Sequence, residues 1–167
     1  MRASVAKITL TVDIAAPPDR VGVFFVPQRM PYWYGAEMPA ELIVLGRPPD
    51  FAAGQKVQIR GTLGQRAVSL TAVVTEYAFA RTLEWRFQDE YGVRGLQRWE
   101  IEKVGDDSRV RLHDEYELPG AFGRIFDWLV TRHAVAHRDL EDLARLKRLA
   151  ENREHTSADR VRAAHSG

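Results

Sequence analysis

The sequence contains no cysteine. Disulfide bridges, a thiolate nucleophile and any zinc or iron–sulfur centre held by cysteine are therefore excluded. It also lacks an excess of charge of either sign, because 24 lysine and arginine residues face 23 aspartate and glutamate residues and leave a net charge of +1. A chain balanced in this way has no field that would attract phosphate backbones, so we expect no nucleic-acid partner.

Long apolar runs are missing as well. No segment approaches the roughly 20 apolar residues of a membrane span, and no signal-peptide core follows Arg2, so we expect a cytoplasmic protein without a membrane span. Serines without a Gly-x-Ser-x-Gly setting and glycines without a strand-to-helix phosphate loop disfavour serine hydrolysis and nucleotide binding. The 167 residues, 45% of them hydrophobic, fit one domain, which we place at residues 1–151, with a disordered tail at 152–167.

An apolar/polar alternation with the period of a half-buried strand begins at residues 7–14. Pro17 and Pro18 then predict a short helix, and the aromatic segment 28–39 is expected to pack over something. Six further strands are predicted, separated by short turns: 41–46, 55–62, 66–77, 82–89, 93–104 and 108–117. Short turns make neighbouring strands antiparallel, and charges on alternate positions indicate a sheet with one wet face.

Residues 120–151 read as one long amphipathic helix, which we expect to cover the dry face of the sheet. Counting about 100° per residue from Phe122, His133 and His137 fall near about 20° and 60°, within the apolar stripe. Arg138 and Asp142 fall on the far side of the helix. A second stripe off the main face is suited to the first helices or to a homodimer contact, and consists of Trp128, Val135 and Leu146.

The order of one strand, a short helix, six strands and a long C-terminal helix resembles the helix-grip superfamily over residues 6–150. This superfamily includes START lipid-transfer domains, birch-pollen-allergen proteins and bacterial polyketide cyclases and dehydratases. The local likenesses are Ile14-Ala15-Ala16-Pro17-Pro18-Asp19-Arg20-Val21, Pro31-Tyr32-Trp33, Val74-Thr75-Glu76-Tyr77, Leu83-Glu84-Trp85 and Arg109-Val110-Arg111-Leu112. The resemblance implies an α+β helix-grip fold, in which a curved antiparallel sheet of about seven strands wraps the C-terminal helix around a deep, mostly apolar cavity.

Combining this cavity with strand parity and helix phase gives the candidate site residues. Those expected to contact a ligand are Trp33, Trp85, Phe87, Gln97, Trp99, Phe126, Val130 and His137. The polar anchors, which would be the catalytic residues of an enzyme, are His133, Asp114 and Tyr116. An imidazole held by a carboxylate moves protons near neutral pH, and a tyrosine hydroxyl donates to an enolate oxygen.

Each polar candidate also has a purely structural interpretation. The histidines can hydrogen-bond to Asp114, Tyr116 or Gln97 simply to satisfy buried groups. A metal site made of His133 and His137 with Asp114 or His113 is disfavoured, because the run His-Ala-Val-Ala-His lacks the glutamate of a zinc-protease helix and His113 lies on the wet face. We expect no metal and no other cofactor.

Three functions are compatible with these features. The first is binding of a hydrophobic small molecule, aromatic, polyketide or lipid-like, in the central cavity. The second is a polyketide cyclase or dehydratase that uses acid–base chemistry in the same cavity. The third is a co-chaperone-like protein-interaction module, which predicts a filled cavity and an exposed apolar patch.

Overall fold

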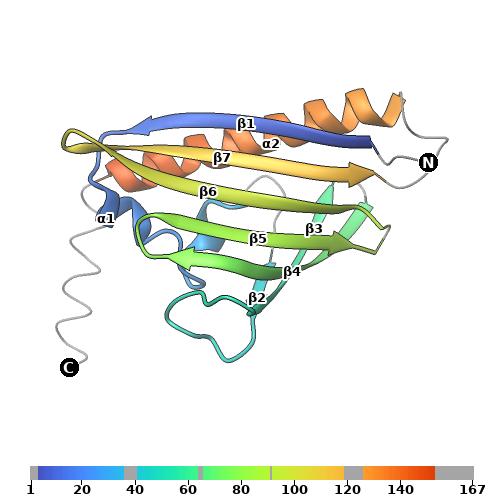
Figure 1. The fold of residues 1–167 in the computed structure, drawn as a ribbon, viewed down its shortest axis with the longest axis horizontal. Coiled ribbons are helices and arrows are strands. Elements are labelled where there is room, and N and C mark those ends of the chain that lie inside the picture. Colours follow the sequence, from blue (N-terminus) through green and yellow to red (C-terminus); the bar gives the residue numbers. More distant parts are fainter. Residues whose placement is uncertain (1–3, 36–40, 64–65, 91, 119–125, 153–167) are drawn as a thin grey trace.

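The computed structural model describes residues 4–35, 41–63, 66–90, 92–118 and 126–152. Within these residues the secondary structure follows the predicted order of strands and helices (Figure 1). The elements are β1 (Ser4–Ile14), α1 (Pro18–Gly22), the 3-10 helix η1 (Met30–Tyr32), β2 (Glu41–Val44), β3 (Lys56–Leu63), β4 (Arg66–Ala78), β5 (Thr82–Asp89), β6 (Arg94–Val104), β7 (Asp107–Leu118) and α2 (Phe126–Glu151). The parts of the predicted helix before residue 126 and of the predicted tail after residue 152 lie outside the described residues.

The seven strands form one antiparallel sheet in the order β1-β7-β6-β5-β4-β3-β2, which confirms the predicted α+β architecture. From β3 to β7, strands that follow one another are joined by short connections, as the turn signals predict, whereas residues 45–55 join β2 to β3. Strand β1 instead pairs with β7, from Ser4 opposite Leu118 to Ile14 opposite Ser108. None of the described helices combines the length and the apolar character that a membrane crossing needs.

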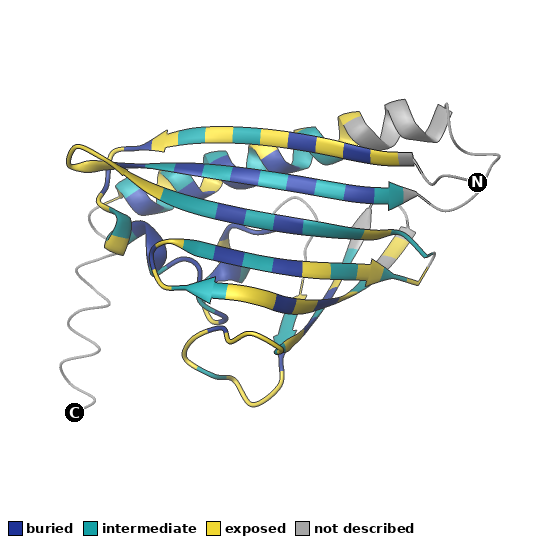
Figure 2. Ribbon diagram, in the orientation of Figure 1, coloured by how far each residue is buried: buried dark blue, intermediate teal, exposed yellow. Residues whose placement is uncertain are grey.

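Each strand alternates between an exposed and a buried side chain, so the sheet has an outer wet face and an inner dry face (Figure 2). The outer face carries ion pairs, among them Arg98 with Glu76 at 2.7 Å and Arg98 with Glu84 at 2.9 Å. Such exposed pairs contribute little to stability. The fold is therefore held mainly by what covers the inner face.

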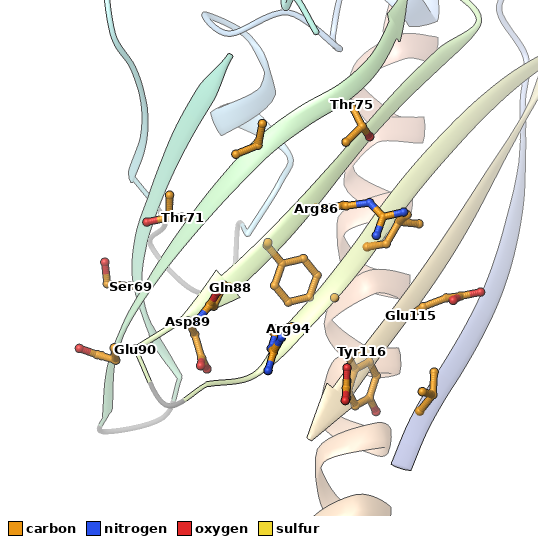
Figure 3. A pocket seen from close by; sticks show the side chains of 16 residues that line it. Ser69, Thr71, Thr75, Arg86, Gln88, Asp89, Glu90, Arg94, Glu115 and Tyr116 are labelled. Carbon is orange, nitrogen blue, oxygen red and sulfur yellow. The ribbon is translucent and has the colours of Figure 1, made fainter. Parts of the chain in front are cut away.

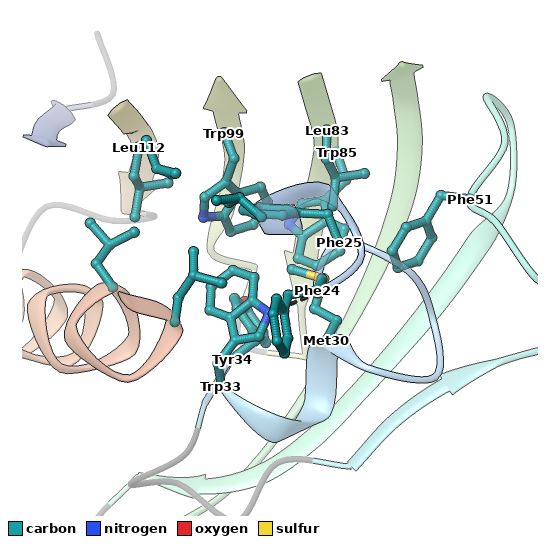
Figure 4. Packing of buried hydrophobic residues seen from close by; sticks show 14 of the residues in the cluster. Phe24, Phe25, Met30, Trp33, Tyr34, Phe51, Leu83, Trp85, Trp99 and Leu112 are labelled. Carbon is teal, nitrogen blue, oxygen red and sulfur yellow. Dashed lines mark hydrogen bonds between the residues drawn. The ribbon is translucent and has the colours of Figure 1, made fainter. Parts of the chain in front are cut away.

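The segment between α1 and β2 covers the centre of that face with aromatic side chains (Figure 4). The Trp33 indole N–H donates to the Phe24 carbonyl at 2.8 Å, so this large ring is buried without an unsatisfied donor. Ring centroids lie 4.9 Å apart between Trp85 and Trp99 and 5.5 Å apart between Tyr34 and Trp85, both edge to face. The C-terminal helix is thus not the only cover of the inner face, because the aromatic segment that was expected to pack over something shares it.

Helix α2 packs along β1 (Figure 1), and its buried face differs from the predicted one. The buried positions are Asp139, Asp142, Leu143, Leu146 and Ala150, whereas Leu140, His133 and His137 are exposed. The helix is therefore rotated by about 100° from the apolar stripe read from the sequence. Placing both histidines in that stripe and Asp142 on the far side was wrong, because two buried carboxyl groups interrupt the true inner face.

The C-terminal end of α2 is tied to the end of β1 by polar contacts. The Lys147 ammonium donates to the Asp13 carbonyl at 2.6 Å and to Glu151 Oε1 at 2.7 Å. The same Glu151 oxygen accepts the backbone N–H of Ala15 at 2.8 Å. These three bonds fix the end of the helix against the turn that leads into α1.

Further along the inner face, the Phe87 ring lies over Gly95, its cross-strand partner on β6. A Cβ at position 95 would collide with the far edge of that ring and with the backbone carbonyl of Glu115 on β7. An aromatic ring laid over a glycine of the neighbouring strand shields backbone that would otherwise be bare. Only glycine fits position 95 while Phe87 keeps this conformation.

Gly95→Ala is accordingly expected to destabilise the protein by about 1 to 3 kcal/mol, since the Glu115 carbonyl is backbone and cannot easily move away. Urea denaturation of the variant against the wild type measures the effect. Combining it with Phe87→Leu is expected to recover part of the loss, because the shorter side chain removes one of the two collisions. Strictly additive losses in the double variant would contradict this packing.

Candidate functional site

The Gln97 side chain on β6 joins three buried groups at the centre of the inner face. Its amide oxygen accepts hydrogen bonds from the Tyr34 hydroxyl at 2.9 Å and the Trp85 indole N–H at 3.1 Å. Its amide nitrogen donates to Asp114 Oδ2 at 3.2 Å. Gln97 is 2% exposed, so these partners replace water entirely.

Asp114 on β7 also faces a charged pair on α2. Arg138 Nη2 lies 3.6 Å from Asp114 Oδ2 and 2.7 Å from Asp139 Oδ1, and Arg138 Nε donates to the same Asp139 oxygen at 3.1 Å. One guanidinium therefore bridges a strand carboxyl group and a helix carboxyl group. Arg138 holds the position beside Asp114 that the sequence interpretation assigned to His133.

A third buried carboxyl group, Asp142, lies on the same helix. Its Oδ2 accepts the backbone N–H of Gly35 at 2.9 Å. Tyr34 and Gly35 follow η1, so the segment after η1 is attached both to β6, through Gln97, and to α2, through Asp142. The polar cluster thus connects sheet, segment and helix.

Two oxygens of this cluster accept no hydrogen bond from any described residue: Asp114 Oδ1 and Asp139 Oδ2. Both are buried away from solvent. A buried carboxylate oxygen without a donor is costly, and such atoms occur at sites that bind or transfer protons more often than elsewhere. This feature distinguishes the cluster from an ordinary satisfied core network.

Burial and, to a lesser degree, the neighbouring Asp139 charge raise the pKa of Asp114 to about 7, against Arg138 and Gln97, which act to lower it. Burial also acts to lower the pKa of Arg138, but Asp139, Tyr34 and Asp114 outweigh it and raise that pKa, so the guanidinium stays charged. Burial likewise raises the pKa of the Tyr34 hydroxyl, which remains a neutral donor to Gln97. Asp114 is thus a carboxyl group that titrates near neutral pH, as acid–base residues do.

The residues predicted to contact a ligand fall into separate regions. Trp33, Trp85 and Trp99 lie in the tightly packed aromatic core. Phe87 belongs to a second, smaller cluster built around Ala6, Ile8 and Tyr116, against which Val135 and Ala136 of α2 pack. Phe126 and Val130 are in α2, but their side chains lie outside the described part of the structure.

Strand alternation placed Gln97, Asp114 and Tyr116 inward, and the structure buries all three. Helix phase placed His133 and His137 beside them, and the structure leaves both imidazoles exposed. The residues that sequence reasoning missed are Tyr34, Arg138, Asp139 and Asp142. Their only signal was a recurrence of acidic residues at helical spacing, 139 and 142, in register with Leu143 and Leu146.

Among the described residues there is no group of three or more histidine, aspartate or glutamate side chains arranged to hold a metal ion. His113, weighed as a third ligand, lies on the outer face, where its Nδ1 is 3.1 Å from the Thr9 hydroxyl.

An open groove of about 1040 Å³ crosses the outer face of the sheet, with α2 behind it (Figure 3). Its walls are mostly polar and charged side chains of β4, β5, β6 and β7, including Thr71, Arg86, Gln88, Arg94 and Glu115. Small-molecule sites are usually enclosed and largely apolar. The lining of the groove also includes Phe87, Gly95 and Tyr116, so the groove reaches the second apolar cluster, and this cluster with the adjacent polar cluster is the better candidate site.

Comparison with known proteins identifies a family that this chain matches. The family model described as "Polyketide cyclase / dehydrase and lipid transport" matches residues 5–151. A comparison with curated protein sequences gives no match.

Three solved structures share the architecture. The protein TTHA0849 from Thermus thermophilus has a TM-score of 0.64 at 19% identity, covering 87% of this chain and 97% of that one. Ara h 8.0201 has a TM-score of 0.65 at 9% identity, covering 88% and 98%. DynU16, from the dynemicin biosynthetic locus, has a TM-score of 0.62 at 18% identity, covering 87% of this chain but 47% of the longer DynU16 chain. At these identities the likeness establishes the fold alone.

Replacing Gln97 with leucine is expected to cost about 2 to 4 kcal/mol of stability, because the Tyr34 hydroxyl, the Trp85 indole N–H and Asp114 Oδ2 all lose their partner. Urea denaturation measures the loss. Gln88→Leu on the exposed face serves as the matched control and is expected to stay within about 0.5 kcal/mol of the wild type. Equal effects of the two substitutions would show that the buried network contributes nothing.

The raised pKa of Asp114 predicts a pH dependence with a definite sign. Because the folded state holds this proton more tightly than the unfolded chain, the stabilisation is complete below about pH 4 and is lost as the pH rises to about 7. The stability of the wild type relative to Asp114→Asn should therefore fall by on the order of 2 to 4 kcal/mol across that window and be flat above it. Denaturation at a series of pH values, with exposed Asp107→Asn as control, checks this, and parallel curves for wild type and Asp114→Asn would refute it.

Proposed function

The chain belongs to the polyketide cyclase/dehydrase and lipid transport family, and we propose that it binds a hydrophobic small molecule against the inner face of its sheet. The observation that carries this proposal is the buried polar cluster with two unsatisfied carboxyl oxygens, set at the edge of an apolar surface. Apolar walls with a few convergent polar groups are the ordinary composition of a small-molecule site.

The ligand lies over the second cluster rather than within the aromatic core. The core around Trp33, Trp85 and Trp99 is filled by the chain's own rings, which touch edge to face. In the second cluster Phe87 and Val135 are only partly buried, and Gly95 contributes no side chain at all. A flat aromatic or aliphatic molecule fits a surface with this composition.

The polar end of the ligand meets the cluster of Gln97, Asp114 and Tyr116. On β6 and β7, Gly95 lies opposite Tyr116 and Gln97 lies opposite Asp114, so the apolar surface and the polar cluster are adjacent rows of the same strand pair. A ligand resting on the Phe87 ring, which itself covers Gly95, therefore extends its polar group toward Asp114. This arrangement orients the ligand as well as holding it.

A second candidate function, acid–base catalysis of the cyclase or dehydratase kind, is favoured by one observation, the titration of Asp114 near neutral pH. A carboxyl group with such a pKa can protonate a leaving hydroxyl or remove a proton next to a carbonyl. In this version Asp114 is the acid–base residue and the exposed His133 is not required. The interaction-module function is supported by the filled aromatic core but not by its other prediction, an exposed apolar patch, because the exposed large apolar side chains of the described surface are spread over separate elements.

Native mass spectrometry of freshly purified protein is the direct test and should reveal a co-purified hydrophobic molecule. Ala136→Phe, which adds bulk beside the second cluster, is expected to reduce occupancy about tenfold or more, while Ala134→Phe on the exposed side of the same helix leaves it unchanged. Binding of the fluorescent probe ANS provides a second readout, and Ala136→Phe is expected to reduce it. The proposal would be contradicted by protein that carries no ligand and binds no ANS, or by equal effects of the two substitutions on ligand occupancy.

A further inference from the structure

Asp114 and Asp139 come from different elements, β7 and α2, yet form one buried carboxyl pair. Each is 1% exposed. A single nitrogen of Arg138 contacts Asp114 Oδ2 at 3.6 Å and Asp139 Oδ1 at 2.7 Å, so the two carboxyl groups lie on the same side of one guanidinium. The nearby Asp139 carboxyl group acts to raise the pKa of Asp114.

The donors around the pair leave one oxygen of each carboxyl group without a partner. Asp114 Oδ2 accepts a hydrogen bond from Gln97 and forms an ion pair with Arg138, and Asp139 Oδ1 accepts a hydrogen bond from Arg138. Asp114 Oδ1 and Asp139 Oδ2 accept nothing from the described residues. Two ionised carboxylates are both acceptors only, so neither can satisfy the other, whereas one proton turns one of them into a donor.

We propose that Asp114 and Asp139 share one proton between Asp114 Oδ1 and Asp139 Oδ2, and that Asp139 is a positioning residue that makes Asp114 the acid–base group of the interior site. The shared proton is inferred from the two carboxyl groups alone, whereas the acid–base role of Asp114 rests on the proposed function. The shared proton satisfies both unpartnered oxygens without water and without a further residue. It is the arrangement that two close carboxyl groups adopt when like charges cannot both ionise.

The charges that face the pair agree with a shared proton. Arg138 is the cation that α2 supplies, β6 presents the neutral amide of Gln97, and the segment after η1 presents the neutral hydroxyl of Tyr34. One guanidinium does not balance the two carboxylates that it contacts in a region without solvent, so a bound proton lowers the excess negative charge.

The proposal specifies what the site offers a ligand. Below the midpoint of its titration the pair holds one neutral carboxylic acid, whose single O–H can donate to a ligand carbonyl oxygen only in place of the other carboxyl group. Above the midpoint both groups are carboxylates and accept from a hydroxyl or phenol group of the ligand. A ligand with a carbonyl group is therefore bound in preference at lower pH, and a phenol at higher pH.

Carbon-13 NMR of protein labelled at the aspartate carboxyl groups tests the proton directly, without any ligand. The wild type is expected to show an Asp114 carboxyl signal that shifts with a midpoint near pH 7. Infrared spectroscopy adds a second readout, the carbonyl band of a protonated carboxyl group, which disappears over the same pH range. Both measurements use the unaltered protein, so they do not depend on a variant that folds.

Variants at position 139 test whether Asp139 raises the midpoint of the Asp114 titration. Asp139→Asn is expected to lower the midpoint of Asp114 by about one pH unit or more, because it removes a negative charge and supplies an amide donor. Asp139→Glu, which keeps a carboxyl group, is expected to restore a raised midpoint. Asp142→Asn is the matched control, since Asp142 is equally buried on the same helix but already accepts the Gly35 N–H, and it should leave the midpoint unchanged.

Two results would overturn the proposal: no aspartate carboxyl signal that titrates between about pH 5 and 8, or an Asp114 midpoint that is the same in Asp139→Asn as in the wild type. The second would mean that burial alone holds the proton. Neither result depends on ligand binding, so failure here is distinguishable from failure of the proposed function in the mass-spectrometric test.

Discussion

The amide of Gln97 is the contact on which the interior depends. Its oxygen takes two donors and its nitrogen gives to a carboxylate, so only one orientation of the amide suits all three partners. On one side this orientation holds the indole of Trp85 and the phenol of Tyr34, which anchor the aromatic core. On the other side it holds Asp114, where the charged cluster begins. A single neutral group therefore separates a dry core from a buried ionic site.

The fold could be predicted from the sequence because its strands have one wet face. Alternation with a period of two is visible wherever one side of a strand meets water, and short turns leave neighbouring strands little choice but to pair antiparallel. The pairing of β1 with β7 has no local signal in the sequence, because it joins strands at the two ends of the series. The cover over the inner face was predicted less well, because the segment that supplies Trp33 and Tyr34 has no regular period.

The candidate site could be predicted on its sheet side and not on its helix side. Strand alternation assigns a face by position whatever the residue type, so Gln97 and Asp114 were assigned correctly to the interior. Helix phase was inferred from apolar residues alone, and the true inner face contains Asp139 and Asp142, which biased that inference by about 100°. Asp139 can be buried because Arg138 donates to it, and Asp142 because it accepts the backbone N–H of Gly35. A hydrogen bond to a backbone amide far away in the chain cannot be inferred from the pattern of residue types.

The ties between the two ends of the domain affect how the polypeptide acquires its structure. Strand β1 is made first, yet its sheet partner β7 and the helix that covers it are made last, and the bonds from Lys147 and Glu151 close loops of more than a hundred residues. Loops of this size close slowly, and contacts so distant in sequence delay folding. During synthesis β1 therefore has no sheet partner until β7 emerges from the ribosome, and until then its edges are open to incorrect pairing.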